Sequence, residues 1–371
     1  MGDYFGKDTP KLGFGLMRLP KKGLRKDIEQ IKTMVDLFMD AGFTYFDTAY
    51  VYLGSEDAAR KALVERYPRE SFTLATKLNA LAAISEKAAK KQFYTSLERT
   101  GAGYFDYYML HAIMENNYKK YEKFHLWDFV KELKEKGLIK YAGFSFHAGP
   151  DLLDRLLTEH PEVDFVQLQI NYADWEAPSV TSRANYEVAR KHGVSITIME
   201  PVKGGSLADP PAEVKKLFKD YHPDMSYASW AIRFAASLEG VITVLSGMSD
   251  IAQMKGNLSF MKDFEPLSDE EHEVIRKARE IISKSTAIPC TACQYCTEGC
   301  PASIPIPEIF AAMNRQLADG QLEEAKADYM KVTAKAGKAS ACIECRQCEE
   351  ECPQHIRITE NMKKAAAMFG E

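Results

Sequence analysis

All eight cysteines of this chain lie in its last quarter, in two copies of a single spacing. Residues 290–301 read CTACQYCTEGCP and residues 342–353 read CIECRQCEEECP, so both copies follow C-x2-C-x2-C-x3-C-P. The second copy begins 52 positions after the first. Thiolates are soft ligands, and three of them within one short run can hold one face of a compact inorganic core. The doubled spacing is the bacterial pattern for a pair of 4Fe–4S clusters.

In that pattern the fourth cysteine of each run ligates the other cluster of the pair. The spacing therefore predicts a first cluster and a second cluster, held respectively by Cys290, Cys293, Cys296 and Cys352, and by Cys342, Cys345, Cys348 and Cys300. Zinc sites are usually built from two separated C-x2-C pairs, and disulfides favour small secreted domains. Both alternatives fit a doubled triplet followed by Cys-Pro less well than iron–sulfur clusters do.

The internal repeat extends beyond the cysteines. CPASIPIPEIFAAM and CPQHIRITENMKKA share Cys-Pro-x-x-Ile-x-Ile-x-Glu before a helix-like tail, which predicts a pseudo-twofold domain. Residues 308–336, between the two runs, are rich in strong helix formers. Residues 286–371 thus resemble the helical two-cluster ferredoxins, and the resemblance implies a small, mainly α-helical domain of bacterial-ferredoxin type.

Composition limits the possible partners and location. The formal charge of −5 provides no basic field for nucleic acid. The first residues, MGDYFGKDTPKLGFG, lack the apolar core of a signal peptide, and no apolar run is long enough for a membrane helix. Because iron–sulfur clusters are oxygen-sensitive and no cysteine is left over, we expect a reducing, cytoplasmic location with neither nucleic acid nor membrane as partner.

Eight short β-branched or aromatic runs recur through the first 250 residues, separated by amphipathic, helix-like stretches. The runs cover residues 13–17, 43–46, 72–76, 105–110, 139–144, 164–170, 194–199 and 241–246. Strands that alternate with helices favour a parallel sheet, and eight such units in this length are typical of a closed (β/α)8 TIM barrel. An open doubly wound sheet is the alternative, but no G-x-G-x-x-G follows an early strand.

These patterns predict an α/β chain of two domains. We expect the barrel over residues 1–265, a connecting helix over residues 266–285 and the 4Fe–4S domain over residues 286–371. Ser268 and Glu271 have the spacing of a capping box at the start of that connecting helix. No low-complexity linker separates the parts, so we expect them to dock rather than to be loosely tethered.

Four polar residues follow consecutive predicted strands, where a barrel places its chemistry. Asp47 follows the second strand, Lys77 the third and His111 the fourth, and Tyr52 lies five residues beyond Asp47. A nearby ammonium favours the phenolate form of a tyrosine, and an aspartate can hold that ammonium in place. The set is suited to protonating a carbonyl oxygen while hydride reaches its carbon.

The stretches FDTAYVYLGSE, LATK and YYMLH resemble the aldo-keto reductases, over residues 10–265. The resemblance implies a barrel without a Rossmann fold that reduces a small carbonyl substrate with NAD(P)H. The catalytic tetrad of the family carries over onto Asp47, Tyr52, Lys77 and His111, with Tyr52 as general acid. Tyr50 lies close by, but the step of five residues from the aspartate selects Tyr52.

The resemblance also implies dinucleotide contacts. Ser145 and Gln167 match the residues that bind the carboxamide, although Phe146 stands where the family has asparagine and His147 is a substitute. Met199 occupies the position of the aromatic ring that stacks on the nicotinamide. Lys203, Gly204 and Gly205 form a loop suited to a pyrophosphate.

The segment after the eighth strand resembles the one that grips the adenosine end, and it offers Ser249, Gln253 and Asn257. Asp250 would repel a 2′-phosphate and hydrogen-bond a free ribose hydroxyl, so NADH is slightly favoured over NADPH. Four aromatic residues are further candidates for the substrate pocket: Tyr50, Trp127, Tyr172 and Trp175.

A different class of function is an iron–sulfur electron-transfer protein in which the barrel connects a substrate or a redox protein partner to the clusters. Hydride carries two electrons, whereas a cluster normally accepts one, so a flavin would be needed to split the pair. The sequence contains no flavin motif, and plain NAD(P)H-dependent reduction is therefore preferred.

Overall fold

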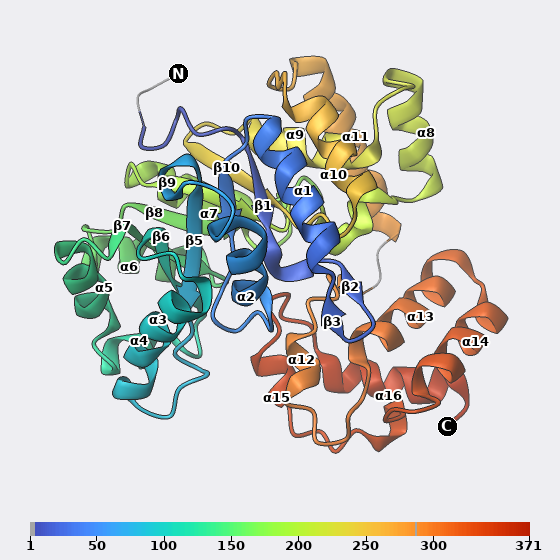
Figure 1. Ribbon diagram of the computed structural model, residues 1–371. Helices are drawn as coiled ribbons and strands as arrows, with labels where there is room; N and C mark the ends of the chain where they lie inside the picture. Colours follow the sequence, from blue (N-terminus) through green and yellow to red (C-terminus); the bar gives the residue numbers. More distant parts are fainter. Residues whose placement is uncertain (1–3, 286–287) are drawn as a thin grey trace. The chain divides into compact units, whose positions relative to one another are not determined.

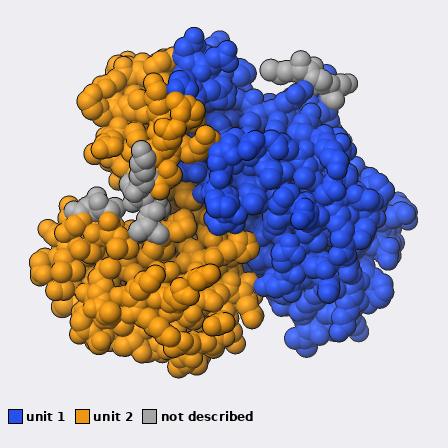
Figure 2. Space-filling model, turned by 180° about the vertical axis from the view of Figure 1, so that it is seen from behind, with its two compact units in different colours: residues 1–202, 225–273 blue, residues 203–224, 274–371 orange. Residues whose placement is uncertain are grey.

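The computed structural model describes residues 4–285 and 288–371, which divide into two compact units (Figure 2). Unit 1 comprises residues 1–202 and 225–273, and unit 2 comprises residues 203–224 and 274–371. Unit 2 is therefore discontinuous in sequence, which the sequence patterns do not indicate. The predicted start of the cluster domain at residue 286 lies outside the described residues.

Unit 1 is built on a closed barrel of eight parallel strands in the order β1-β10-β9-β8-β7-β6-β5-β4 (Figure 1). The strands are β1 (Leu12–Gly15), β4 (Tyr45–Asp47), β5 (Thr73–Leu78), β6 (Phe105–Ile113), β7 (Ile139–Phe146), β8 (Phe165–Gln169), β9 (Ser195–Met199) and β10 (Val241–Ser246). β1 pairs with both β4 and β10 and so closes the sheet. The predicted barrel is confirmed, and each predicted strand overlaps an observed one.

Helices alternate with the strands, as the sequence predicts (Figure 1). Those of unit 1 are α1 (Ile28–Asp40), α2 (Ser55–Ala59), α3 (Glu86–Thr100), α4 (Tyr118–Lys123), α5 (Leu126–Glu135), α6 (Pro150–Glu159), α7 (Ser182–Lys191), α9 (Tyr227–Ala236) and α10 (Ile251–Met261). Short β2 (Lys21–Lys22) and β3 (Arg25–Lys26) form a separate antiparallel hairpin. Side chains cap several of these helices, as Asp27 does for α1 by accepting a hydrogen bond from the Gln30 amide.

The barrel interior changes from apolar to polar along the strands. An apolar cluster consists of Tyr45, Ala75, Tyr107, Met109, Phe165, Ile242 and Leu245. Because side chains alternate between the two faces of a strand, the residue two positions further along points the same way. Those residues are Asp47, Lys77, His111 and Gln167. The alternation therefore places four buried polar side chains above the apolar cluster.

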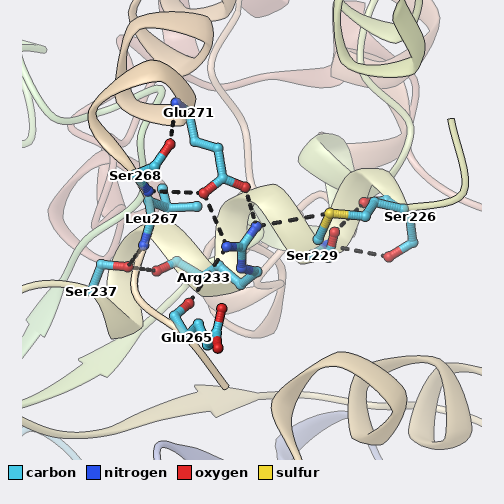
Figure 3. A network of polar contacts seen from close by, with 9 residues as sticks. Ser226, Ser229, Arg233, Ser237, Glu265, Leu267, Ser268 and Glu271 are labelled. Carbon is cyan, nitrogen blue, oxygen red and sulfur yellow. Dashed lines mark hydrogen bonds and ion pairs between the residues drawn. The ribbon is translucent and has the colours of Figure 1, made fainter. Parts of the chain in front are cut away.

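A buried ion pair anchors the start of α11 (Asp269–Ser285) to α9 (Figure 3). Arg233 donates two hydrogen bonds to Glu271, at 2.6 and 3.1 Å. The Ser268 amide donates to the Glu271 carboxylate at 2.9 Å, and the Glu271 amide donates to the Ser268 hydroxyl at 3.2 Å. The predicted capping box is confirmed, and its glutamate has an additional partner that sequence spacing does not indicate.

We expect Glu271→Gln to lower the free energy of unfolding of unit 1 by roughly 3 kcal/mol, because it leaves a buried guanidinium without its counter-charge. Glutamine still fits the capping box, so the change isolates the ion pair. The measurement is urea unfolding followed by tryptophan fluorescence, since all three tryptophans lie in unit 1. Ser268→Ala, which removes only the cap, should cost about 1 kcal/mol. Equal losses for the two variants would contradict the prediction.

Unit 2 is helical, as predicted. Its helices are α8 (Ala212–Tyr221), α12 (Tyr295–Glu298), α13 (Ile306–Asp319), α14 (Leu322–Thr333), α15 (Gln347–Glu350) and α16 (Ile358–Phe369), together with the C-terminal part of α11. The repeated isoleucines Ile304, Ile306, Ile356 and Ile358 all lie in its hydrophobic core. No helix in the described part of the chain is long and apolar enough to cross a membrane.

The two cysteine runs have the same backbone conformation. Helices α12 and α15 occupy equivalent positions of the repeat, as do α13 and α16. Non-glycine residues with positive φ also recur in pairs 52 positions apart, namely Ala292 with Glu344, Gln294 with Arg346, and Ser303 with His355. The predicted pseudo-twofold repeat is thus visible in the backbone dihedral angles.

Candidate active site and cluster sites

The buried pair of Lys77 and Asp47 forms the base of the candidate site. Lys77 is fully buried on β5, and its ammonium donates to Asp47 Oδ1 at 2.5 Å and to the Thr48 carbonyl at 2.8 Å. Burial raises the pKa of Asp47 and lowers the pKa of Lys77, and the charge of each residue opposes the shift of the other. The two residues are held as one unit by neighbouring parallel strands.

Gln167 on β8 lies on the other side of Asp47. Its amide nitrogen is 3.4 Å from Asp47 Oδ2 and 3.5 Å from the Thr197 hydroxyl. This contact links the predicted carboxamide-binding residue to the predicted tetrad. The hydrogen bond also lowers the pKa of Asp47, against the larger effect of burial.

Tyr52 and His111 come together with Lys77. The rings of Tyr52 and His111 meet edge-to-face with centroids 5.6 Å apart, and the Lys77 ammonium lies 5.2 Å from the Tyr52 ring centroid. The neighbouring Tyr50 has a different partner, because the Arg99 guanidinium lies 4.6 Å from its ring centroid. The structure therefore brings the four predicted tetrad residues together, whereas the ring of Tyr50 lies against Arg99 and only its backbone amide bonds to Lys77, at the carbonyl.

His111 is buried in β6. The hydroxyl of Tyr121 donates to the His111 carbonyl, which fixes the backbone there. Burial lowers the pKa of the imidazole well below its usual value, and the charges of Lys77 and His147 lower it further. The ring is consequently neutral at neutral pH. Its Nδ1 makes no hydrogen bond to any of the described residues.

A bulge in β6 follows His111. Ala112 has φ 55°, and the pairing register with β7 shifts between Leu110 and Ile113. The Ala112 amide donates to the Ser145 hydroxyl at 2.7 Å. Ser145, a predicted carboxamide contact, therefore also holds the strand end that carries His111. The amide of His147 bonds to the Ile113 carbonyl at 2.9 Å and continues this connection.

Glu56 and Arg99 form a polar layer behind the site that the sequence patterns do not indicate. Glu56 is 2% exposed; it accepts from the Thr76 hydroxyl at 2.9 Å and from Arg99 at 3.2 Å. Arg99 also donates to the Tyr50 carbonyl at 3.1 Å. The network ties the loop that carries Tyr52 to β5. A glutamate in LGSE, just after that loop, is the available sequence signal, whereas nothing marks Arg99.

The remaining predicted dinucleotide residues lie in three places. Met199 is at the end of β9, and Lys203, Gly204 and Gly205 form a turn that belongs to unit 2. Near the start of α10, the Gln253 side chain accepts from the Ser249 amide, and Asp250 caps the helix by accepting from the Gln253 amide, both at 2.8 Å. The buried Asn257 donates to Ser246 at 2.9 Å.

The contacts of the four aromatic pocket candidates are mainly packing contacts. Trp127, on α5, stacks on His160 with centroids 3.9 Å apart. Trp175 packs edge-on against Phe234 of α9 at 5.5 Å. Tyr172 is fully buried against the same ring. Aromatic residues in a barrel are more often core than pocket, and sequence position alone does not separate the two.

In unit 2 the predicted second cluster coincides with a cavity. Its four cysteines, Cys300, Cys342, Cys345 and Cys348, line one hollow together with Ile304, Ile306, Ile358 and Met362. Burial and the nearby charges of Glu349 and the other three cysteines raise the pKa of Cys348 to about 11. One cysteine from the first run thus joins three from the second.

The first quartet is grouped in the same way. Burial raises the pKa of the Cys296 thiol, and the nearby cysteines that add to this are Cys293, Cys290, Cys352 and, last, Cys348. The Ala292 amide lies 3.4 Å from Cys290 Sγ. Successive amides in such turns form concavities that suit iron–sulfur sites. Among the described residues no three ligand side chains converge on a single ion.

Models of known protein families match both parts of the chain. Residues 11–280 match the model of the aldo/keto reductase family, and residues 289–356 match that of a 4Fe-4S dicluster domain. An aldo-keto reductase of Mycolicibacterium vanbaalenii is 30% identical over 62% of this chain and 77% of its own length. One of Mycolicibacterium smegmatis is 27% identical over 55% of this chain and 69% of its own.

Solved structures resemble the barrel. The holo form of an aldo-keto reductase from Bacillus halodurans superposes with a TM-score of 0.58 at 25% identity, over 72% of this chain and 91% of that one. An aldo-keto reductase from Klebsiella pneumoniae in complex with NADPH has a TM-score of 0.59 at 18% identity, over 72% and 90%. The chain therefore belongs to the aldo/keto reductase family, and a 4Fe-4S dicluster domain follows its barrel.

Proposed function

We propose that the protein reduces a small carbonyl substrate with NAD(P)H in its barrel and carries two 4Fe–4S clusters in its C-terminal domain. The observation that carries the proposal is the buried ion pair of Lys77 and Asp47 beside the Tyr52 ring. The proposed domain bounds are residues 1–265 for the barrel, 266–285 for the connecting helix and 286–371 for the cluster domain. A cytoplasmic location follows from the oxygen sensitivity of the clusters.

In the proposed reaction Tyr52 gives its phenolic proton to the carbonyl oxygen. The ammonium of Lys77 favours the phenolate that remains, and Asp47 holds that ammonium in place. The neutral His111 orients the carbonyl oxygen by hydrogen bonding, for which its low pKa is suited. The dinucleotide, when bound, supplies the hydride.

The proposed dinucleotide contacts are Ser145, Gln167, Met199, Lys203, Gly204, Gly205, Ser249, Gln253 and Asn257. The NADPH complex of the Klebsiella pneumoniae protein supports the cofactor class. Asp250 next to the predicted adenosine contacts keeps NADH slightly favoured, because a carboxylate repels a 2′-phosphate. Its capping bond to Gln253 occupies only one of its two oxygens.

The fit of the cysteines supports two clusters. We expect anaerobically purified protein to contain about eight iron and eight sulfide per chain, four of each from either cluster. Iron and acid-labile sulfide assays, with zinc measured in parallel, provide the test. About two zinc with negligible iron after anaerobic reconstitution would disprove the cluster assignment.

Carbonyl reduction is tested with purified protein and a panel of aldehydes and ketones, with NADH and NADPH compared under anaerobic conditions. We expect carbonyl turnover with little reduction of the clusters, because hydride transfer delivers both electrons at once. Electron paramagnetic resonance monitors the oxidation state of the clusters. Rapid cluster reduction by the nicotinamide alone would instead favour the electron-transfer role and a redox protein partner.

A further inference from the structure

The segment Lys203–Ala208 packs directly against the first cysteine run within unit 2. Gly204 has φ +68°, and a Cβ atom placed there would lie 2.2 Å from the carbonyl oxygen of Thr291. Such a distance means that the two backbones are in contact and that no other residue fits at position 204. Thr291 immediately follows Cys290 in the sequence.

The position equivalent to Thr291 in the second repeat is not covered in this way. Thr291 is 3% exposed, whereas its equivalent in the second run, Ile343, is 68% exposed. The second run is open elsewhere too, since Cys345 is exposed and no cysteine of the first quartet is. Two sites with the same ligand spacing therefore have different surroundings.

The surroundings also differ in charge. Burial raises the pKa of the Cys290 thiol; the charge of Glu308 adds to this effect, and the charge of Lys203 opposes it. Glu308 lies in the first turn of α13, and its carboxylate accepts a hydrogen bond from the side-chain amide of Gln294 at 2.9 Å. For Cys348 in the second quartet, the leading charge is that of Glu349, which also raises the pKa of Cys352 in the first quartet. A buried cation is thus placed beside the first quartet, with Lys203 only 6% exposed.

We propose that Lys203, held against the first cysteine run by Gly204, raises the reduction potential of the first cluster so that it accepts an electron before the second cluster does. The inference rests on the proposed pair of clusters but not on the carbonyl reductase activity. Each cluster gains one negative charge when it takes up one electron. A nearby ammonium stabilises that charge, the more so where water is excluded.

The test is an anaerobic redox titration with dithionite as reductant, in which the clusters are followed by electron paramagnetic resonance. In Lys203→Gln we expect the midpoint potential of one cluster to fall and that of the other to stay. Lys203→Arg should retain the original potential. Glu308→Gln should shift the same cluster in the opposite direction, to a higher potential. The shifting signal should be the one that is missing from Cys296→Ala.

Matched controls use the same substitutions elsewhere in unit 2. Lys216→Gln removes an exposed lysine of α8, and Glu360→Gln changes the repeat equivalent of Glu308. Both variants should leave the midpoint potential of the first cluster unchanged. If Lys203→Gln fails to assemble its clusters, Glu308→Gln becomes the deciding variant. A rise in the midpoint potential of the first cluster supports the inference, and an unchanged potential overturns it.

The outcomes separate this inference from the proposed function. Unchanged potentials in variants that contain about eight iron overturn this inference alone. Wild-type protein without iron overturns both the cluster assignment and this inference. The predicted shifts in a protein that reduces no carbonyl support this inference and disprove only the reductase activity.

Discussion

Tyr52→Phe is expected to lower carbonyl reduction by roughly 100- to 10,000-fold, the usual contribution of a general acid. Its affinity for the dinucleotide should stay nearly unchanged, because the hydroxyl acts mainly in the transition state. The rate is measured by oxidation of NADH or NADPH and the affinity by quenching of tryptophan fluorescence. Loss of both together would point to a structural role for Tyr52.

Tyr50→Phe is the matched control for this experiment. The two tyrosines share one loop, but Tyr50 lies against Arg99 and Tyr52 against Lys77 and His111. We expect Tyr50→Phe to retain most of the activity. If it lost the activity that Tyr52→Phe retained, the assignment of the general acid would be wrong. Lys77→Met should resemble Tyr52→Phe, because it removes the charge that favours phenolate.

The second large effect concerns the crossed ligation of the clusters. We expect Cys352→Ala to halve the iron content, from about eight to about four per chain, by removing the first cluster. Adding Cys296→Ala should cost no further iron, because both residues serve the same cluster. Adding Cys348→Ala instead should remove nearly all iron. Iron assays after anaerobic reconstitution measure all three results.

The alternative arrangement predicts the opposite pattern. If each cluster took its four cysteines from one run, Cys348 and Cys352 would share a cluster, and Cys296 would serve the other. The double variant of Cys352 and Cys348 would then keep about four iron, and that of Cys352 and Cys296 would lose nearly all. Iron content alone therefore distinguishes the two arrangements.

The barrel and the grouping of Asp47, Tyr52, Lys77 and His111 were predictable because their signals are local. Strand periodicity indicates which residues face inward, and the residues near the carboxyl ends of β4, β5 and β6 must meet at one end of a parallel barrel. The cysteine spacing is equally local and covers both quartets. The partners of site and cap residues, such as Arg99 next to Tyr50 or Arg233 next to Glu271, depend on which helix faces pack together. No short sequence pattern encodes that packing.

Two other features were beyond sequence reasoning for different reasons. The packing partner of Trp127 is one, because an aromatic residue on an amphipathic helix suits a pocket and packing equally, and here it stacks on His160. The assignment of residues 203–224 to unit 2 depends on contacts with residues 274–371, which lie at least 50 positions later. The hydrophobic periodicity within residues 203–224 does not indicate such contacts.

The discontinuity of unit 2 affects how such a chain can be synthesised and rearranged. Residues 203–224 leave the ribosome well before the first cysteine run, so unit 2 cannot be completed until the later segment has been translated. A barrel cut off at residue 285 would expose the surface of that segment, and an isolated C-terminal piece would lack it. Unit 2 is thus drawn from two separate stretches of the chain, and recombination that exchanged it whole would have to replace both stretches of the gene at once.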